Sequence, residues 1–141
     1  MKRALVDTNI ILDLLAKREP FHTESAQIFS LADTGEVELI VSALSLLNTH
    51  YVLESTLKRK KAKSLIGKFK VLVTVHELND KIIELALNDD EFSDFEECVH
   101  NYTAIESQSE AIITRNIKDY KKSTLTILSP KEFISQRIAK R

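Results

Sequence analysis

The fold is decided near the start of the chain, in the stretch RALVDTNIILDLL that spans residues 3–15. Residues Arg3 to Val6 favour a buried strand, which ends abruptly at Asp7. Apolar residues then return with helical spacing over about Ile10 to Ala16. Open parallel sheets place their ligand sites at the carboxyl ends of strands. Asp7 is therefore the leading candidate for a functional residue, although an acid here would also suit the cap of the following helix.

The rest of the chain alternates between strand and helix patterns. Further strands are expected at about Glu38–Val41, Val71–Val75, Ala111–Thr114 and Leu125–Leu128. Further helices are expected after Pro20, from Ser45, within the basic segment 58–70, after Asn79, from Asp94 and from Ser129. This alternation predicts an α/β fold in which helices cover both faces of a mostly parallel, about five-stranded sheet.

Length and composition favour one soluble domain spanning residues 1–141. The chain has only two glycines, two prolines and no low-complexity linker. No apolar stretch approaches the ~20 residues needed to span a bilayer, so no membrane partner is expected. The first apolar run is broken by acids, which argues against a secretory signal and favours the cytoplasm. A single cysteine, Cys98, excludes an internal disulfide and suits a reducing compartment.

Charge is distributed unevenly along the chain, although the formal net charge is only -1. Residues 58–70 contain seven basic residues and no acid, whereas residues 77–110 contain eleven acids and one lysine. The basic stretch could contact phosphates and the acidic stretch could hold divalent cations. Two solvated helix faces of opposite sign would give the same pattern, so charge alone does not decide between these interpretations.

Several strand ends carry polar residues that a parallel sheet would bring to one edge. These are Asp7, Ser42 and the run Thr114-Arg115-Asn116, and the helix from Asp94 adds Glu97. Clustered carboxylates repel one another, and a bound Mg²⁺ or Mn²⁺ relieves that repulsion. Such a site suits phosphodiester hydrolysis. The alternatives are ordinary caps and turns, because Asp94 and Glu97 also have the spacing of a capping box.

Four motifs in this order resemble those of a PIN domain: LVDTNIILD (5–13), VSALS (41–45), DFEEC (94–98) and ITRNIKDY (113–120). The resemblance covers essentially the whole chain. It implies a PIN-like three-layer α/β/α sandwich and an Mg²⁺- or Mn²⁺-dependent endoribonuclease like the VapC toxins of bacterial toxin-antitoxin pairs. The partners it implies are RNA, an antitoxin protein and a second copy of the chain in a homodimer.

The resemblance also assigns roles to individual residues. Asp7 matches the first acid of the family, Glu97 the acid that heads the later helix, and Asp94 a frequent additional acid one turn earlier. Asn116 stands where many members have an aspartate, and Asp119 lies near enough to substitute. Asp7, Asp94, Glu97 and Asn116 are thus the expected catalytic residues, and together with Asp119 they are the expected metal ligands.

Asn48 departs from the family pattern, which usually has a glutamate at that position. An amide oxygen can still ligate a hard cation, but it removes one negative charge from the site. Ser42, Asn48, Thr114 and Arg115 form the expected substrate-binding set, with Arg115 directed at an RNA phosphate. Because Asn48 and Asn116 are both amides, a second hypothesis is a weakened or inactive PIN-like module that binds RNA or protein.

Two further residues lie close to Glu97 in the sequence. His100 lies one turn after Glu97 and is expected either to approach the site behind the acids as a supporting group or to be a partly buried helix histidine. Cys98 is expected to pack in the interior rather than to act as a nucleophile, since no basic residue stands close to it in sequence. Neutralising Asp7 is expected to relieve repulsion among crowded acids and to leave stability unchanged or higher.

Overall fold

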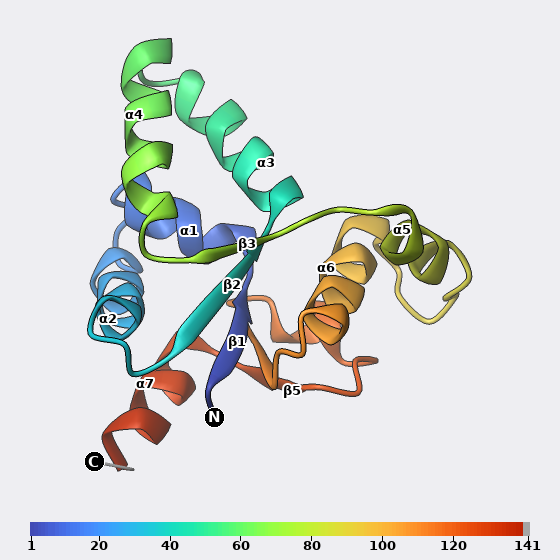
Figure 1. Cartoon of the computed structure of the whole chain (residues 1–141). Helices are drawn as coiled ribbons and strands as arrows, with labels where there is room; N and C mark the ends of the chain where they lie inside the picture. The colour runs from blue at the N-terminus through green and yellow to red at the C-terminus, as the bar shows by residue number, and fades with distance from the viewer. Residues whose placement is uncertain (140–141) are drawn as a thin grey trace.

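A computed structural model describes residues 1–139 and has a five-stranded, fully parallel sheet between two layers of helices (Figure 1). The strands are β1 (Arg3–Val6), β2 (Glu38–Ser42), β3 (Thr74–His76), β4 (Ala111–Ile113) and β5 (Thr126–Leu128). Their order across the sheet is β3-β2-β1-β4-β5, with β1 in the centre. The predicted α/β/α sandwich is confirmed.

Seven α-helices and one 3-10 helix are assigned within residues 1–139. They are α1 (Thr8–Leu15), α2 (His22–Asp33), α3 (Ala43–Glu54), α4 (Arg59–Lys70), α5 (Asp80–Leu87), α6 (Phe95–Glu106), η1 (Ile117–Tyr120) and α7 (Pro130–Ala139). Helices α1, α2 and α7 lie on one side of the sheet, and α5 and α6 lie on the other (Figure 1). Helices α3 and α4 form a hairpin that projects beyond the sheet. None of the helices in this part of the chain is long and apolar enough to cross a membrane.

Both faces of the sheet are apolar because successive residues of a strand point to opposite sides. In β1, Ala4 and Val6 belong to the core beneath α1 and α2, whereas Leu5 belongs to the core beneath α6. Ile112 of β4 and Tyr120 of η1 belong to the same core cluster as Leu5. Near-continuous apolar strands of this kind are typical of a parallel sheet that is covered on both faces.

The strand expected at Val71–Val75 begins later than the sequence pattern indicated. Strand β3 spans Thr74–His76, and Val71 is 85% exposed. The backbone amides of Val71, Leu72 and Val73 donate to carbonyls in the last turn of α4 instead of pairing with β2. The end of α4 therefore holds Val71, Leu72 and Val73, although β-branched residues such as valine favour strands.

Candidate active site at the carboxyl edge of the sheet

Asp7 joins the central strand to the first helix. Its amide donates to the carbonyl of Ile113 at 3.0 Å, which continues the pairing of β1 with β4. Its carboxylate Oδ1 accepts from the amide of Thr8 at 2.7 Å, so Asp7 is the N-cap of α1. The capping role and the site role are thus compatible, because the other carboxylate oxygen faces the loop after β4.

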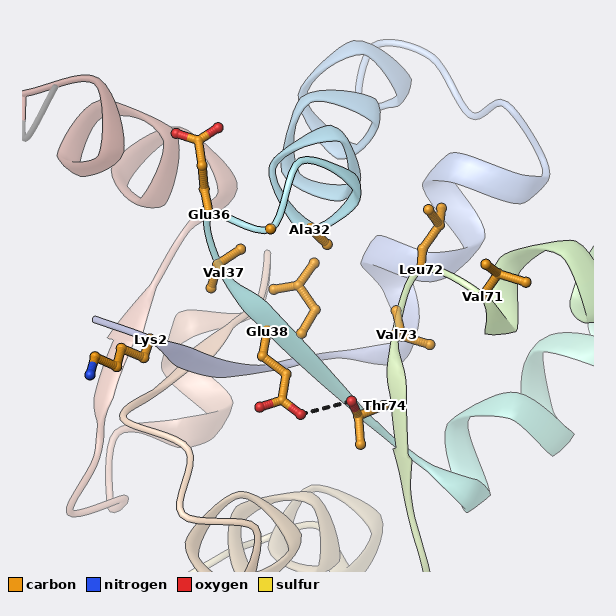
Figure 2. Close-up of a pocket in the computed structure, with 11 residues that line it drawn as sticks. Lys2, Ala32, Glu36, Val37, Glu38, Val71, Leu72, Val73 and Thr74 are labelled. Atoms are coloured by element: carbon orange, nitrogen blue, oxygen red, sulfur yellow. Dashed lines mark hydrogen bonds between the residues drawn. The ribbon is translucent and has the colours of Figure 1, made fainter.

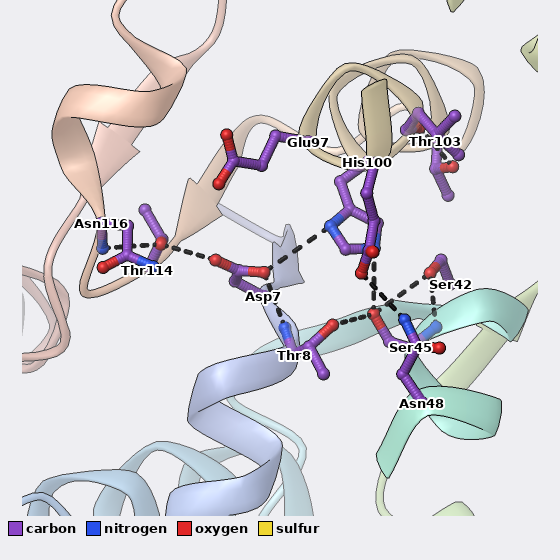
Figure 3. Close-up of polar contacts among 12 residues, drawn as sticks. Asp7, Thr8, Ser42, Ser45, Asn48, Glu97, His100, Thr103, Thr114 and Asn116 are labelled. Atoms are coloured by element: carbon purple, nitrogen blue, oxygen red, sulfur yellow. Dashed lines mark hydrogen bonds and ion pairs between the residues drawn. The ribbon is translucent and has the colours of Figure 1, made fainter. Parts of the chain in front are cut away.

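Asp7 is buried, with 5% of the residue exposed, and its carboxylate has three donors around it (Figure 3). Besides the Thr8 amide, the Thr114 hydroxyl donates to Oδ2 at 2.8 Å, and Nδ1 of His100 lies 3.6 Å from Oδ1. Burial alone would raise the pKa of Asp7, but the contact and charge of His100, followed by the bonds from Thr114 and Thr8, hold it below its ordinary value. The structure therefore stabilises Asp7 as a carboxylate.

His100 is 1% exposed and is part of a buried polar network. Its Nδ1 lies 3.3 Å from the Tyr120 hydroxyl, and its Nε2 lies 3.2 Å from the Oγ of Ser45. The Ser45 hydroxyl also contacts Thr8 Oγ1 at 2.8 Å and Ser42 Oγ at 3.2 Å. This network links α1, α3 and α6 beneath Asp7, so His100 supports the site from behind the acid, which is the first of the two positions expected for it.

The other acids crowd around Glu97. Burial, then the hydrogen bond and charge of Asp119, then the charges of Asp94 and Asp7 raise the pKa of Glu97 from its ordinary 4.5 to about 8. Within residues 1–139, no lysine, arginine or histidine forms an ion pair with Glu97 or Asp119. The repulsion expected of this site therefore falls on Glu97, whereas Asp7 is compensated by its donors.

Asp94 acts as a helix cap, with its Oδ1 accepting from the Glu97 amide at 3.0 Å. This is the structural role that the capping-box spacing indicated. Asp94 nevertheless lines the same crevice as Asp7 and Glu97, together with Asn116. The crevice has a volume of about 240 Å³ and lies at the carboxyl ends of β1 and β4.

Asn48 lines the crevice from α3, and its Nδ2 donates to Oε1 of Glu96 at 2.8 Å. The sequence shows Glu96 only as part of the motif 94–98, whereas the structure places it on the crevice wall. Asn48 and Glu96 are separated by 48 residues. No local pattern could have paired them.

The four residues expected to bind substrate have different positions. Thr114 donates to the Asp7 carboxylate, whereas Asn48 donates to Glu96 on the crevice wall. Ser42 is buried and caps α3, with its Oγ accepting from the Ser45 amide at 3.0 Å. Arg115 points away from the crevice into a separate hollow and forms an ion pair with Asp13 at 2.7 Å. The sequence placed Arg115 at an RNA phosphate and gave no sign of this buried partner.

Divalent cations fit the chemistry of these donors. In residues 1–139, no group of three or more histidine, cysteine, aspartate or glutamate side chains is already arranged to hold a metal ion. Mg²⁺, however, usually takes only one or two carboxylates, with water and substrate phosphates as the other ligands. Asp7 and Glu97 offer two such carboxylates, while Asn116 and Asp119 add oxygens at the same edge. The raised pKa of Glu97 indicates excess negative charge that a cation would compensate.

A larger hollow, of about 540 Å³, lies at the opposite edge of the sheet and lacks this chemistry (Figure 2). Its Glu38 accepts from the Thr74 hydroxyl at 2.8 Å and pairs with Arg3 at 2.8 Å. Elsewhere, the pKa of the Cys98 thiol is raised to about 11 by burial and by the charge of Asp89, which agrees with a packing role. The carboxyl edge is therefore the candidate active site.

Solved structures of bacterial toxin proteins share the fold of this chain at low sequence identity. VapBC2 from Rickettsia felis, solved bound to a DNA fragment from its promoter, is 16% identical with a TM-score of 0.68, covering 90% of this chain and 98% of that chain. A toxin-antitoxin complex from Klebsiella pneumoniae is 19% identical with a TM-score of 0.69, covering 90% and 97%. VapC20 from Mycobacterium tuberculosis, a sarcin-ricin loop cleaving toxin, is 15% identical with a TM-score of 0.61, covering 77% and 86%.

No protein with a curated description matches the sequence. The sequence pattern of the PIN domain, in contrast, matches residues 3–118, which include every residue of the crevice. The match agrees with the fold, with the order of the four motifs and with the acids at the carboxyl edge. The chain belongs to the PIN domain family.

Proposed function

We propose that this PIN domain is a metal-dependent endoribonuclease that acts as the toxin of a toxin-antitoxin pair. The observation that carries the proposal is the crowding of Asp7, Asp94 and Asp119 around Glu97, whose pKa is raised to about 8. Crowded acids at the carboxyl edge of a parallel sheet suit a Mg²⁺ or Mn²⁺ site. Asp7, Glu97, Asn116 and Asp119 would hold the ion.

The chain's own residues prepare the site for chemistry. The Thr8 amide, the Thr114 hydroxyl and His100 keep Asp7 charged and fixed in direction. Asn48 holds Glu96 at the rim and leaves Glu97 free to face the crevice. When bound, the cation would orient water for attack on the phosphodiester and stabilise charge on the leaving oxygen.

The hairpin of α3 and α4 supports RNA as the substrate. Its basic face, defined here as the seven cationic residues of 58–70, is exposed, and none of these residues forms an ion pair within the described chain. Unpaired surface lysines and arginines supply the sequence-independent affinity for a phosphate backbone. RNA would thus reach the crevice along a basic surface that does not select bases.

Two protein partners follow from the same reasoning. The likeness to a toxin-antitoxin complex from Klebsiella pneumoniae supports an antitoxin, which would cover the acidic crevice by offering an arginine to its carboxylates. The exposed side chains of Leu47 (70%) and Tyr51 (79%) on α3 support a homodimer, since large apolar groups on one helix face favour contact with a second copy. Co-purification with the product of an adjacent small reading frame tests the antitoxin.

The test of the enzyme uses a circular single-stranded RNA, because only an endonuclease can open a substrate without ends. Wild-type protein with Mg²⁺ or Mn²⁺ is expected to linearise it, and EDTA is expected to stop the reaction. Asp7→Asn should cut the rate by more than about 100-fold. Asparagine remains a good helix cap, so the variant should still fold. Glu38→Gln makes the same charge change at the other edge and should cleave normally. Unchanged cleavage by Asp7→Asn would remove Asp7 from the mechanism.

One observation favours a second candidate, a catalytically weakened module that binds RNA or protein. Asn48, where the family usually has a glutamate, contributes a neutral amide that is directed at Glu96. Calorimetric titration separates the two candidates. Retained RNA binding without Mn²⁺ binding at millimolar concentration would favour the binding module, whereas Mn²⁺ binding that Asp7→Asn abolishes would favour the enzyme.

A further inference from the structure

Asp13 is a buried acid that the crevice does not use. It lies on α1, is 1% exposed, and faces the hollow formed by α1, α2 and the start of α7. Arg115 binds it with two nitrogens, Nε at 2.7 Å from Oδ2 and Nη2 at 3.2 Å from Oδ1. The guanidinium also lies over the ring of Phe21, with Cζ 3.9 Å from the ring centroid.

This arrangement fixes the Arg115 side chain in both position and direction. A bidentate guanidinium-carboxylate pair has a defined plane, and stacking on an aromatic ring restricts that plane further. The donors that point at Asp13 are unavailable to a phosphate. The geometry is therefore that of an anchor rather than of a substrate contact.

The anchored residue belongs to the loop that enters the active site. Its neighbour Thr114 reaches the opposite way, donating to Asp7 Oδ2 at 2.8 Å and accepting the Asn116 amide at 2.9 Å. Two consecutive residues thus fasten this loop to α1 at two points, Asp7 at the start of the helix and Asp13 further along it. Asn116 and Asp119, which follow directly, face the crevice and Glu97.

We propose that Asp13 and Arg115 are positioning residues: their ion pair holds residues 114–120 so that Asn116 and Asp119 stand where the active site requires them. The proposal deepens the proposed function and rests on it for the role of the cation. It gives Arg115 a role different from the phosphate contact that the sequence predicted.

The chain provides a matched control for the test. Arg18 is a second cation on Asp13, with Nη1 3.8 Å from Oδ1, but it follows α1 and has no part in the loop. Arg115→Gln and Arg18→Gln each remove one cation from the same carboxylate. Only Arg115→Gln releases the loop, and Arg115→Lys keeps the charge while losing the bidentate geometry.

The first measurement is amide hydrogen exchange at Asn116 and Asp119 in the metal-free protein. Exchange should be faster in Arg115→Gln and unchanged in Arg18→Gln, with Arg115→Lys between them. The second is Mn²⁺ affinity by calorimetry, which should fall about tenfold in Arg115→Gln and stay within about twofold in Arg18→Gln. If Arg115→Gln does not fold, Arg115→Lys decides both measurements.

RNA cleavage kinetics separate anchoring from phosphate contact. A positioning residue should lower kcat with little change in KM, whereas a phosphate ligand should raise KM alone. Equal exchange rates and Mn²⁺ affinities in Arg115→Gln and Arg18→Gln would overturn the proposal, as would an effect on KM alone. Failure of wild-type protein to bind Mn²⁺ would instead reject the proposed function. The amide-exchange comparison of Arg115→Gln with Arg18→Gln would then still test whether Arg115 anchors the loop.

Discussion

The two ends of the parallel strands, called here the amino edge and the carboxyl edge of the sheet, shift the pKa values of their acids in opposite directions. At the amino edge, Glu38 accepts from the Thr74 hydroxyl and from Arg3, and these contacts keep the pKa of Glu38 below its ordinary value. At the carboxyl edge, burial and neighbouring acids raise the pKa of Glu97 to about 8. Both acids belong to the same small domain, so the difference comes from the groups placed beside each one.

This comparison indicates which acids serve the fold and which serve a ligand. Partners at the amino edge satisfy Glu38 within the chain, although the larger hollow lies there. Glu97 gains full compensation only from a proton or a cation supplied from outside. Cavity size is therefore a weaker guide to function here than the balance of charge.

Added Mn²⁺ should produce the largest difference between the two edges. A concentration 100 times the dissociation constant should stabilise the wild-type protein by about 2.7 kcal/mol, because the ion binds the folded state. Glu97→Gln and Asp119→Asn should lose most of this gain, whereas Glu38→Gln should keep it. Thermal unfolding followed by circular dichroism, with and without Mn²⁺, makes the comparison. Equal losses at both edges would contradict it.

Restoring an acid at position 48 should sharpen the contrast. Asn48→Asp adds a carboxylate to the crevice wall and is expected to tighten Mn²⁺ binding by about tenfold, since affinity rises with ligand charge. The same change removes the Asn48 donor from Glu96 and should lower the stability of the metal-free protein. Asn88→Asp, at the end of α5, is a control outside the crevice. If calorimetry finds the same Mn²⁺ affinity in Asn48→Asp and Asn88→Asp, the side chain at position 48 does not contact the ion.

The raised pKa of Glu97 should be visible in the pH dependence of stability of the metal-free protein. Its folded pKa of about 8 exceeds the ordinary 4.5, so the folded protein binds a proton more tightly and loses stability as pH rises between these values. Solvent screening of this partly buried group limits the loss to about 1 kcal/mol. Glu97→Gln should flatten the profile. Urea unfolding at several pH values measures it, and an unchanged slope in the variant would assign the dependence elsewhere.

The smallest effect is expected at the amino edge. Glu38→Gln removes one exposed ion pair with Arg3 and should cost about 0.5 kcal/mol at neutral pH, since surface pairs contribute little. Its pKa is lowered, so this contribution should be present above the ordinary value of 4.5 and disappear in acid. Urea unfolding at pH 7 and pH 3 checks both statements; a loss of several kcal/mol would mean that the edges differ less than their geometry indicates.

Sequence patterns predicted the strands well where apolar runs end in a polar residue, as at Asp7 and Ser42. They failed at Val71–Val73, because hydrogen bonds to the end of α4 outweigh the strand preference of valine. For the site, parallel topology was enough to bring Asp7, Glu97 and Asn116 to one edge. The partners of His100 and Arg115 could not be predicted, since Ser45 and Asp13 are 55 and 102 residues away.

The outer strands of the sheet have a consequence for how this domain meets other chains. Strands β3 and β5 are the outermost strands, each with one unpaired side, and each is only three residues long. Such short outer strands offer few free backbone groups with which an extended segment of another protein could pair. The same shortness protects against aggregation. We therefore expect any protein that joins this domain to bind through helices, with side chains setting the specificity, rather than by extending the sheet.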